Sequence, residues 1–330
     1  MNVKVVGCGL SGITAAVLLK EKGYNVTIYD TRNHIGGNCY DSNICSTLVH
    51  NYGPHIFHTN DEEVFSFLSR YTEWFDFKYQ PLGNTKLGTI PLPYSKKTIQ
   101  ALGRELTREE IVNVIFKDYS EKQWGVPFEQ IPKSITNRIP KTKDEEDPTW
   151  YGSEKYQCLP KYGYTAMMNK MLEDVSVVLN CNENYWKDVE SDLTIYTGKI
   201  DEYFGYRYGK LPYRSLDFVH KTTSTKLQVV AINQNNKTND STRIYDHSYF
   251  NYLHKGVTVI TEEYPKECGE NDIPFYPIPW GKGLQMYAKY KELADKESNT
   301  IFLGRLATYT YLDMWMAIKQ VMLKIKSLEL

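Results

Sequence analysis

Two histidines, His55 and His58, lie three residues apart directly after a Gly-Pro turn in the stretch HNYGPHIFHTND, residues 50–61. Two imidazoles at such a spacing hold a metal when a helix presents both rings on one face and a third ligand lies nearby. Pro54 argues against a helix here, because proline lacks a backbone donor and clashes with the preceding turn. The chain also contains no HExxH pattern and no Cys/His cluster. We therefore predict no metal site and expect the two rings to serve a different chemistry.

A glycine-rich loop that could hold a diphosphate opens the chain. Residues 3–30 read VKVVGCGLSGITAAVLLKEKGYNVTIYD, in which Gly7, Gly9 and Gly12 form the pattern GxGxxG between a predicted strand and a predicted helix. Glycines let the backbone approach a pyrophosphate, whose charge then meets the helix N-terminus. Asp30 ends a second predicted strand and follows Gly12 by 18 residues, close to the ~20 expected of an acid that accepts from a ribose hydroxyl. The pattern predicts a dinucleotide-binding unit.

A second glycine pair moves the prediction from NAD to FAD. The segment TRNHIGGN, residues 31–38, places Arg32 ahead of Gly36 and Gly37. It resembles the arginine and double-glycine extension of flavin-binding Rossmann proteins, in which a second glycine turn lets further backbone amides reach the cofactor. A plain NAD dehydrogenase gives no reason for a glycine pair at this distance.

Composition and charge exclude several function classes. The chain has 330 residues, of which 41% are hydrophobic and 24% charged, as is typical of a globular protein with a large core. A formal net charge of −1 provides no field that would attract nucleic acid or an anionic membrane. No apolar run approaches the ~20 residues that span a bilayer, and the sequence begins with a strand pattern. The six cysteines show no regular spacing. We expect a cytoplasmic protein with reduced thiols and no leader peptide.

Blocks of sequence along almost the whole chain carry a family resemblance. The sequence resembles the bacterial UDP-galactopyranose mutases, a family of flavin-dependent nucleotide-sugar mutases. The blocks are DTRNHIGGN (30–38), YGPHIFHT (52–59), YSEKQWG (119–125), ITNRIP (135–140), LPKYGYT (159–165), FGYRYGKLPYRSLDF (204–218), STRIYDHSYF (241–250), ENDIPFYPI (270–278) and FLGRLATYTYLDM (302–314).

The resemblance implies an isomerase that interconverts the pyranose and furanose forms of a UDP-sugar. The reaction is redox-neutral, yet the family requires reduced FAD. N5 of the reduced flavin attacks the anomeric carbon and expels UDP, and the resulting flavin–sugar adduct opens, recloses and is displaced by UDP. The protein must then hold a charged diphosphate and bring the anomeric carbon to N5.

The family's functional residues transfer onto this chain by resemblance. Arg138 and Arg305 match arginines that clamp the diphosphate, since guanidinium forks suit phosphate oxygens. His55 and His58 match the segment that lies against the flavin and shapes its reactive face. The expected cofactor contacts are Gly7, Gly9, Ser11, Gly12, Asp30, Arg32, Gly36, Gly37, Asn38, His55, Ile56, Arg305, Leu312, Asp313 and Met314. The expected substrate contacts are Phe116, Tyr119, Ser120, Trp124, Arg138, Tyr151, Asn233, Arg243, Tyr276, Arg305 and Tyr311, with Tyr119 stacking on uracil.

Each of these residues also has a structural interpretation. A tyrosine in a segment such as FYPIP is more often a half-buried packing residue, and Trp124 could belong to a core. Arg138 precedes the acidic run at 144–147 and could form a surface ion pair, which contributes little. The resemblance across many blocks favours the functional interpretation.

The predicted fold class is α/β, with a discontinuous Rossmann-like FAD-binding domain, a small helical domain and an antiparallel β-sheet domain. The FAD-binding domain takes residues 1–76, 175–204 and 276–330. The helical domain takes 94–155 and includes a charged, proline-bounded loop that the resemblance makes a mobile substrate loop. The sheet domain takes 77–93 and 205–275, where 227–233, 242–250 and 256–264 read as strands. Apolar residues at helical spacing predict a last helix from Met314.

Departures from the family pattern leave the sugar and the oligomeric state open. The section between PLPYS and FKDYSEKQW is about thirty residues shorter than in the familiar mutases, where it contributes to a homodimer. Tyr79 replaces an asparagine, and Ala307 and Thr310 replace a glycine and an arginine. His58 and Lys161 are the residue types of galactose-specific members, which favours UDP-galactose. UDP-N-acetylgalactosamine and dTDP-fucose remain alternatives, as do an FAD-dependent oxidoreductase and a non-catalytic nucleotide-sugar binder.

Overall fold

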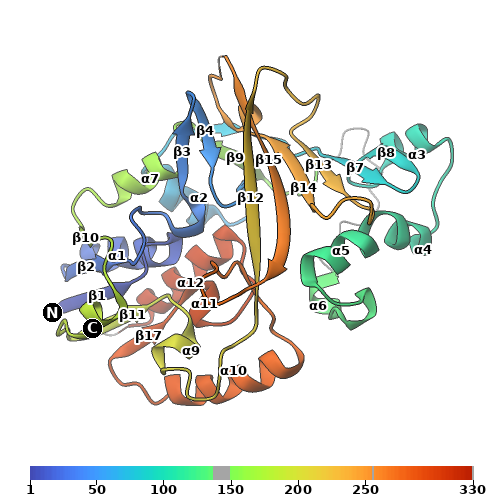
Figure 1. Ribbon diagram of the computed structural model, residues 1–330. Coiled ribbons are helices and arrows are strands. Elements are labelled where there is room, and N and C mark those ends of the chain that lie inside the picture. The colour runs from blue at the N-terminus through green and yellow to red at the C-terminus, as the bar shows by residue number, and fades with distance from the viewer. Residues whose placement is uncertain (137–148, 255, 329–330) are drawn as a thin grey trace.

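A five-stranded parallel sheet forms the base of the molecule in the computed structural model, which describes residues 1–136, 149–254 and 256–328 (Figure 1). Its strands come from three distant parts of the chain, so a Rossmann-like sheet is assembled discontinuously. Both faces of the sheet are covered, which explains why four of the five residues of its first strand are buried, including Lys4. The strand order is β10 (Ser176–Val178), β2 (Asn25–Tyr29), β1 (Asn2–Val6), β11 (Leu193–Tyr196) and β17 (Thr300–Phe302).

Two long helices pack against each other beside this sheet, and the first of them contacts its strands. Helix α1 (Leu10–Glu21) is buried over most of its length because it lies between the sheet and α12 (Met314–Lys326). In α12 the buried residues Ile318, Val321 and Ile325 recur at spacings of three and four, which places them on one helix face. The predicted last helix is therefore confirmed, and the α/β Rossmann-like architecture confirms the predicted fold class.

A seven-stranded sheet rises above the parallel sheet. Its longest strands pair antiparallel over the registers Arg214↔Glu267 to Thr223↔Thr258, and they stand upright at the centre of Figure 1. A single parallel pair joins residues from the first hundred positions to this sheet. The order is β16 (Tyr276–Pro277), β12 (Tyr213–Thr223), β15 (Thr258–Glu267), β14 (Arg243–Asp246), β13 (Ala231–Gln234), β7 (Leu82–Thr85) and β8 (Gly88–Pro91).

A helical lobe flanks this sheet on the right of Figure 1 and docks through one buried and one partly buried cation. Arg214 of β12 donates from Nε to the carbonyl oxygen of Gln123 at 2.9 Å, which ties down the end of α5. The Lys122 ammonium donates to the carbonyl oxygens of Gln234, Asn239 and Ser241 at 2.8, 2.9 and 2.7 Å. Burial lowers the pKa of Lys122 to about 8. The lobe consists of α3 (Lys96–Leu102), α4 (Arg108–Ile111), a π-helical turn (Val112–Phe116), α5 (Lys117–Trp124), a 3₁₀ turn (Phe128–Gln130) and α6 (Lys133–Thr136).

Smaller elements connect these parts. A hairpin pairs β3 (Asp41–Ile44) with β4 (Thr47–His50), and a three-stranded sheet has the order β5 (Phe57–Thr59), β9 (Tyr156–Pro160) and β6 (Trp74–Asp76). The remaining helices are α2 (Glu62–Ser69), α7 (Tyr164–Met171), α8 (Glu183–Lys187), α9 (Ile200–Tyr203), α10 (Gly281–Ala294) and α11 (Gly304–Ala307), with 3₁₀ turns at Gly37–Cys39 and His247–Phe250.

Three local expectations differ from the structure. The predicted strand 227–233 begins only at Ala231, as β13. The segment 242–250 does not remain a strand, because Asp246 accepts from the Ser248 amide at 2.8 Å and starts a 3₁₀ turn. Helix α10 was not expected, and its weak apolar stripe explains why, since only Gly283 and Tyr290 are buried. Within the described ranges, no helix has both the length and the apolar character to cross a membrane.

Candidate functional site

A cavity of about 300 Å³ opens at the carboxyl ends of the parallel strands, where ligands bind in open α/β sheets. The loops after β1, β2, β11 and β17 supply its walls. It is lined by most of the expected cofactor contacts, namely Gly7, Gly9, Ser11, Asp30, Arg32, Gly36, Gly37, Asn38, His55, Arg305, Leu312, Asp313 and Met314. Gly12 and Ile56 are the exceptions. Both are packed behind the wall, Gly12 against strand β1 and Ile56 in the core.

The loop glycines have separate physical roles. A Cβ on Gly12 would lie 1.9 Å from the carbonyl oxygen of Gly7, so this glycine allows α1 to approach the sheet. Gly7 has a φ of +102°, which favours glycine. A Cβ on Gly9 would meet only the Gly37 Cα, at 3.8 Å, so its missing side chain leaves space for a ligand. Gly9 also caps α1 without a side-chain hydrogen bond, which leaves amide donors at the helix N-terminus for an anion.

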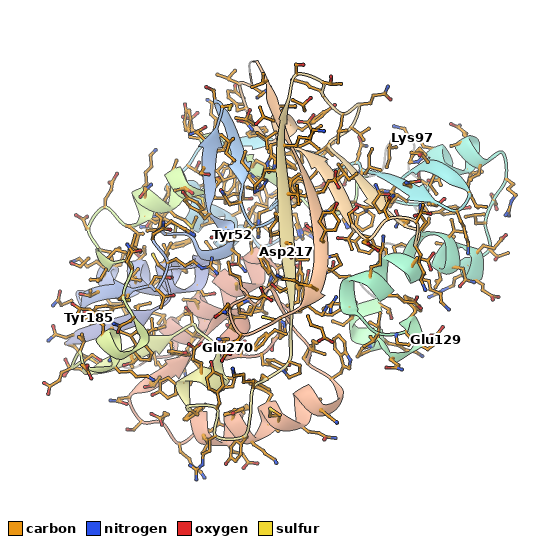
Figure 2. The ribbon with its side chains drawn as sticks, viewed as in Figure 1. Tyr52, Lys97, Glu129, Tyr185, Asp217 and Glu270 are labelled. Carbon is orange, nitrogen blue, oxygen red and sulfur yellow. The ribbon has the colours of Figure 1, made fainter. Side chains whose placement is uncertain are left out.

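Charged side chains complete the fit for a dinucleotide. The Asp30 carboxylate accepts from the backbone amides of Cys8 at 2.6 Å and Arg32 at 2.8 Å, which fixes it at the cavity. Arg32 donates from Nη2 to Asn38 Oδ1 at 2.8 Å and lies 4.9 Å from the ring of Tyr52, whose central position Figure 2 shows. Its buried Nη1 has no hydrogen-bond partner among the described residues, although an unmade bond of this kind costs about 1–3 kcal/mol. This donor fits a polar group of a bound cofactor.

His55 faces this cavity as a neutral ring of known tautomer. Its Nδ1 lies 2.7 Å from the carbonyl oxygen of Gly53, and a carbonyl can only accept, so Nδ1 carries the proton. Nε2 is then left as a hydrogen-bond acceptor. Burial lowers the pKa of His55 to about 3, and the neighbouring His50 adds to this effect. His55 can therefore accept a hydrogen bond from a cofactor but cannot donate a proton near neutral pH.

His58 lies in a different environment and does not line the cavity. Its ring stacks on Tyr151, with centroids 3.7 Å apart and an interplanar angle of 12°. Its Nδ1 lies 2.7 Å from Glu154 Oε2. Over the residues that the structure describes, no three His, Cys, Asp or Glu side chains converge as a metal site.

Buried neutral histidines predict a loss of stability in acid. Burial lowers the pKa of His50 to about 3, and His247 is likewise depressed. Unfolded histidine titrates near 6.5, so between about pH 6.5 and 3 the unfolded chain binds protons that the folded chain does not. The stabilisation is complete above this window and is lost as the pH falls through it, by about 1.4 kcal/mol per pH unit for each histidine.

Urea unfolding at pH 7 and pH 5 measures this effect. We expect His50→Gln to show a smaller drop in unfolding free energy between the two pH values than the wild type. An identical drop in both proteins would contradict the assignment.

A second group of functional residues surrounds Arg243 on the seven-stranded sheet. Arg243 Nη2 forms a 2.7 Å ion pair with Glu263, its partner on the neighbouring strand, and Glu263 is fully buried. Asn233 lies opposite Arg243 on the other side. Burial raises the pKa values of three surrounding tyrosines, so their hydroxyl groups keep their protons and can donate. These tyrosines are Tyr119, Tyr151 and Tyr276.

Several buried polar atoms in this cluster have no partner among the described residues. They are Tyr79 Oη, Asn233 Oδ1, Arg243 Nε and Tyr245 Oη. Burying polar groups without hydrogen bonds is unfavourable, and native proteins contain few of them. Their concentration around one guanidinium indicates a site for a polar ligand.

Aromatic rings connect the Arg243 cluster with the cavity. Tyr276 and Tyr311 stack with centroids 5.6 Å apart, and the Arg305 guanidinium lies 5.7 and 5.1 Å from the two rings. Trp124 reaches Tyr276 from the helical lobe at 5.9 Å. The ligand site and the cofactor cavity therefore share one wall.

The two expected clamp arginines are not placed alike. Arg305 lines the cavity, but it donates to the carbonyl oxygens of Phe275 at 3.0 Å and Leu312 at 2.5 Å, so its fork is largely used within the protein. Arg138 lies outside the described residues. Arg243 was expected only as a further substrate contact. It is instead the guanidinium around which the buried polar atoms without partners among the described residues gather.

The other expected contacts lie in or beside the lobe. Phe116 packs in the core of the helical lobe, three residues before Tyr119, which belongs to α5. Ser120 follows Tyr119 on α5 and is half-buried. Lys161 instead pairs with Glu73 at 2.8 Å on the surface, away from His58.

Sequence reasoning missed two groups of residues. Thr197 follows β11 at the cavity and could have been found from the rule that ligands bind beyond the carboxyl ends of parallel strands. Val259, Thr261 and Glu263 occupy every second position of β15 and are all fully buried. They therefore share the inward face of the strand, and Glu263 places a charge on that face. An acid at such a position signals a buried cationic partner.

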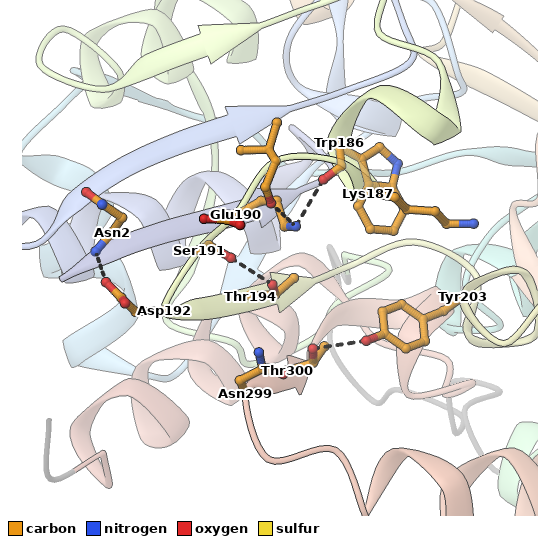
Figure 3. A pocket seen from close by; sticks show the side chains of 12 residues that line it. Asn2, Trp186, Lys187, Glu190, Ser191, Asp192, Thr194, Tyr203, Asn299 and Thr300 are labelled. Carbon is orange, nitrogen blue, oxygen red and sulfur yellow. Dashed lines mark hydrogen bonds between the residues drawn. The ribbon is translucent and has the colours of Figure 1, made fainter.

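A larger hollow at the opposite ends of the strands is a weaker candidate. It measures about 680 Å³ and lies by the amino ends of β1, β11 and β17 (Figure 3). Its polar groups bond one another: Lys4 Nζ donates to the carbonyl oxygens of Trp186 at 3.0 Å and Val189 at 2.8 Å, and Asp192 accepts from the Asn2 amide at 2.7 Å. These internal pairings leave less for a ligand than the cavity at the carboxyl ends.

Comparisons with known proteins agree with this geometry. A family model for UDP-galactopyranose mutase matches residues 114–311, and a model for an NAD(P)-binding Rossmann-like domain matches residues 5–71. A probable UDP-galactopyranose mutase of Klebsiella pneumoniae is 34% identical, over 97% of this chain and 93% of the relative. A dTDP-fucopyranose mutase of Escherichia coli is 31% identical, over 97% and 96% of the two chains.

A crystal structure of reduced UDP-galactopyranose mutase shares the fold, with a TM-score of 0.78 at 14% identity over 98% and 94% of the two chains. With a family model matching more than half of its length and relatives at this identity and coverage, the chain belongs to the UDP-galactopyranose mutase family.

Proposed function

We propose that the protein interconverts the pyranose and furanose forms of UDP-galactose with bound FAD. The single observation that carries this proposal is the Arg243 cluster, with its unpartnered polar atoms and tyrosine hydroxyl groups, beside a cavity built for a dinucleotide. Reduced flavin, when bound, supplies the nitrogen nucleophile for the sugar. The cluster supplies donors for a diphosphate, whose departure and return the reaction requires.

Residues of the cavity would hold the flavin. The amides at the start of α1 would meet its pyrophosphate, and Asp30 would accept from its ribose. His55, with Nε2 unprotonated, would accept a hydrogen bond at the reactive face. Leu312 to Met314, at the start of α12, would line the isoalloxazine end.

Residues of the Arg243 cluster would hold the substrate. Arg243 and the hydroxyl groups of Tyr151, Tyr276 and Tyr311 would bind phosphate oxygens, and Arg305 would connect the two sites. Tyr119 would stack on the base, and Trp124 would border the sugar. Arg138 would add a second charge, as the family resemblance implies.

Turnover by reduced and oxidised protein tests this proposal. We expect the dithionite-reduced holoprotein to convert UDP-galactose to the furanose without consuming oxygen, and the oxidised form to be inactive. Parallel reactions with dTDP-fucose and UDP-N-acetylgalactosamine identify the preferred sugar. Peroxide formation with a sugar or an amine would indicate an oxidoreductase instead, and a purified protein without flavin would indicate a binding protein.

A further inference from the structure

Glu154 makes a contact that the mutase chemistry described above does not use. Its Oε2 lies 2.7 Å from Nδ1 of His58, and the two side chains are only 28% and 14% exposed. A carboxylate accepts, so Nδ1 of His58 donates. The bond fixes the imidazole against rotation about its last side-chain torsion, which is broad when unrestrained.

The orientation of His58 bears directly on Tyr151. The two rings lie 3.7 Å apart and nearly parallel, at 12°. A second ring contact of Tyr151 is with Tyr79, at 6.2 Å and 31°. The position of the Tyr151 hydroxyl within the Arg243 cluster therefore depends on the plane of His58.

Glu154 can act on His58 without supporting the surrounding backbone. The turn that carries Tyr151 is held by other groups: the Trp150 amide donates to the Tyr79 carbonyl oxygen at 2.9 Å. The Gln157 side chain donates to the carbonyl oxygens of Gly152 at 2.9 Å and Glu154 at 3.1 Å. Removing the Glu154 carboxylate would leave all of these bonds in place.

We propose that Glu154 is a positioning residue for the nucleotide-sugar, which acts through His58 to hold Tyr151 in its binding orientation. The inference rests on the proposed function, because Tyr151 is taken there to contact the substrate. Glu154 itself does not line the dinucleotide cavity.

A double-mutant cycle on the holoprotein separates this role from a structural one. We expect Glu154→Ala to raise KM for UDP-galactose and Kd for UDP about tenfold, with a smaller change in kcat and unchanged flavin absorbance. Glu154→Gln should restore most of the loss, because its amide oxygen can accept from the same Nδ1. In a His58→Phe background, which keeps a stacking ring but has no Nδ1, Glu154→Ala should add less than about twofold.

Glu73→Ala is the matched control, since Glu73 forms a comparable ion pair with Lys161 at 2.8 Å on the surface. It should leave both constants unchanged. The inference is overturned if Glu154→Ala leaves KM and Kd unchanged, or if its full effect persists with Phe at position 58. Absence of turnover in the wild type would instead refute the proposed function, and the UDP titration would still decide the role of Glu154.

Discussion

Arg243→Lys is expected to lower kcat/KM for the nucleotide-sugar by on the order of 10²- to 10³-fold, the range seen when one preorganised transition-state donor is lost. Lysine keeps a positive charge for buried Glu263 but loses the planar fork and the Nε that has no partner among the described residues. Arg243 does not line the dinucleotide cavity, so flavin should stay bound. Steady-state kinetics of the reduced holoprotein, together with flavin absorbance, measures both effects.

Lysine is the informative substitution at this position. Alanine would leave Glu263 as an unpaired buried charge, which costs about 3–5 kcal/mol and confuses folding with function. Arg70→Lys is a matched control, because Arg70 pairs with Glu21 at the surface with half of its side chain exposed. If Arg243→Lys retained kcat/KM within threefold of the wild type, the diphosphate would have to bind elsewhere.

Gly9→Ala is expected to give a folded protein that has lost most of its flavin. The new methyl group would meet only Gly37 Cα at 3.8 Å, so the fold accepts it, but it occupies the space left for the pyrophosphate. We expect the FAD dissociation constant to rise at least roughly tenfold, which corresponds to about 1.4 kcal/mol. Flavin fluorescence during titration of the apoprotein, with circular dichroism for the fold, measures this.

Gly12→Ala provides the contrast within the same loop. Its methyl group would lie 1.9 Å from the carbonyl oxygen of Gly7, a backbone atom that cannot move without displacing β1 from α1. We expect a lower unfolding temperature in this variant even without cofactor. A Gly9→Ala protein with full flavin content would refute the assignment of the cavity.

The parts of the fold that depend on neighbouring residues were predictable from sequence. The glycine loop, the acid at Asp30 and the amphipathic face of α12 are set by spacing along one segment, so their physical causes can be seen in the sequence itself. The cofactor cavity followed from these local signals. Most of its expected residues line it.

The substrate side depended on contacts that sequence spacing does not encode. Arg243 and Glu263 meet because β14 pairs with β15 in one particular register, and that register is fixed only when the whole sheet forms. His55 and His58 are neighbours in sequence, yet one turns to Gly53 and the other to Glu154, almost a hundred positions away. Motif reasoning treated the pair as a unit because it could not see the second partner.

The discontinuous parallel sheet also sets an order of events during synthesis. Strand β1 is flanked by β2 and β11, β17 completes the edge of the sheet, and α12 packs against α1, which lies on one face of the sheet. A nascent chain that carries the glycine loop therefore lacks the far wall of its cavity until residues 300–326 leave the ribosome. We therefore expect flavin binding only after residue 326 has emerged, and a ribosome-stalled chain that ends before β17 should remain colourless in the presence of excess FAD.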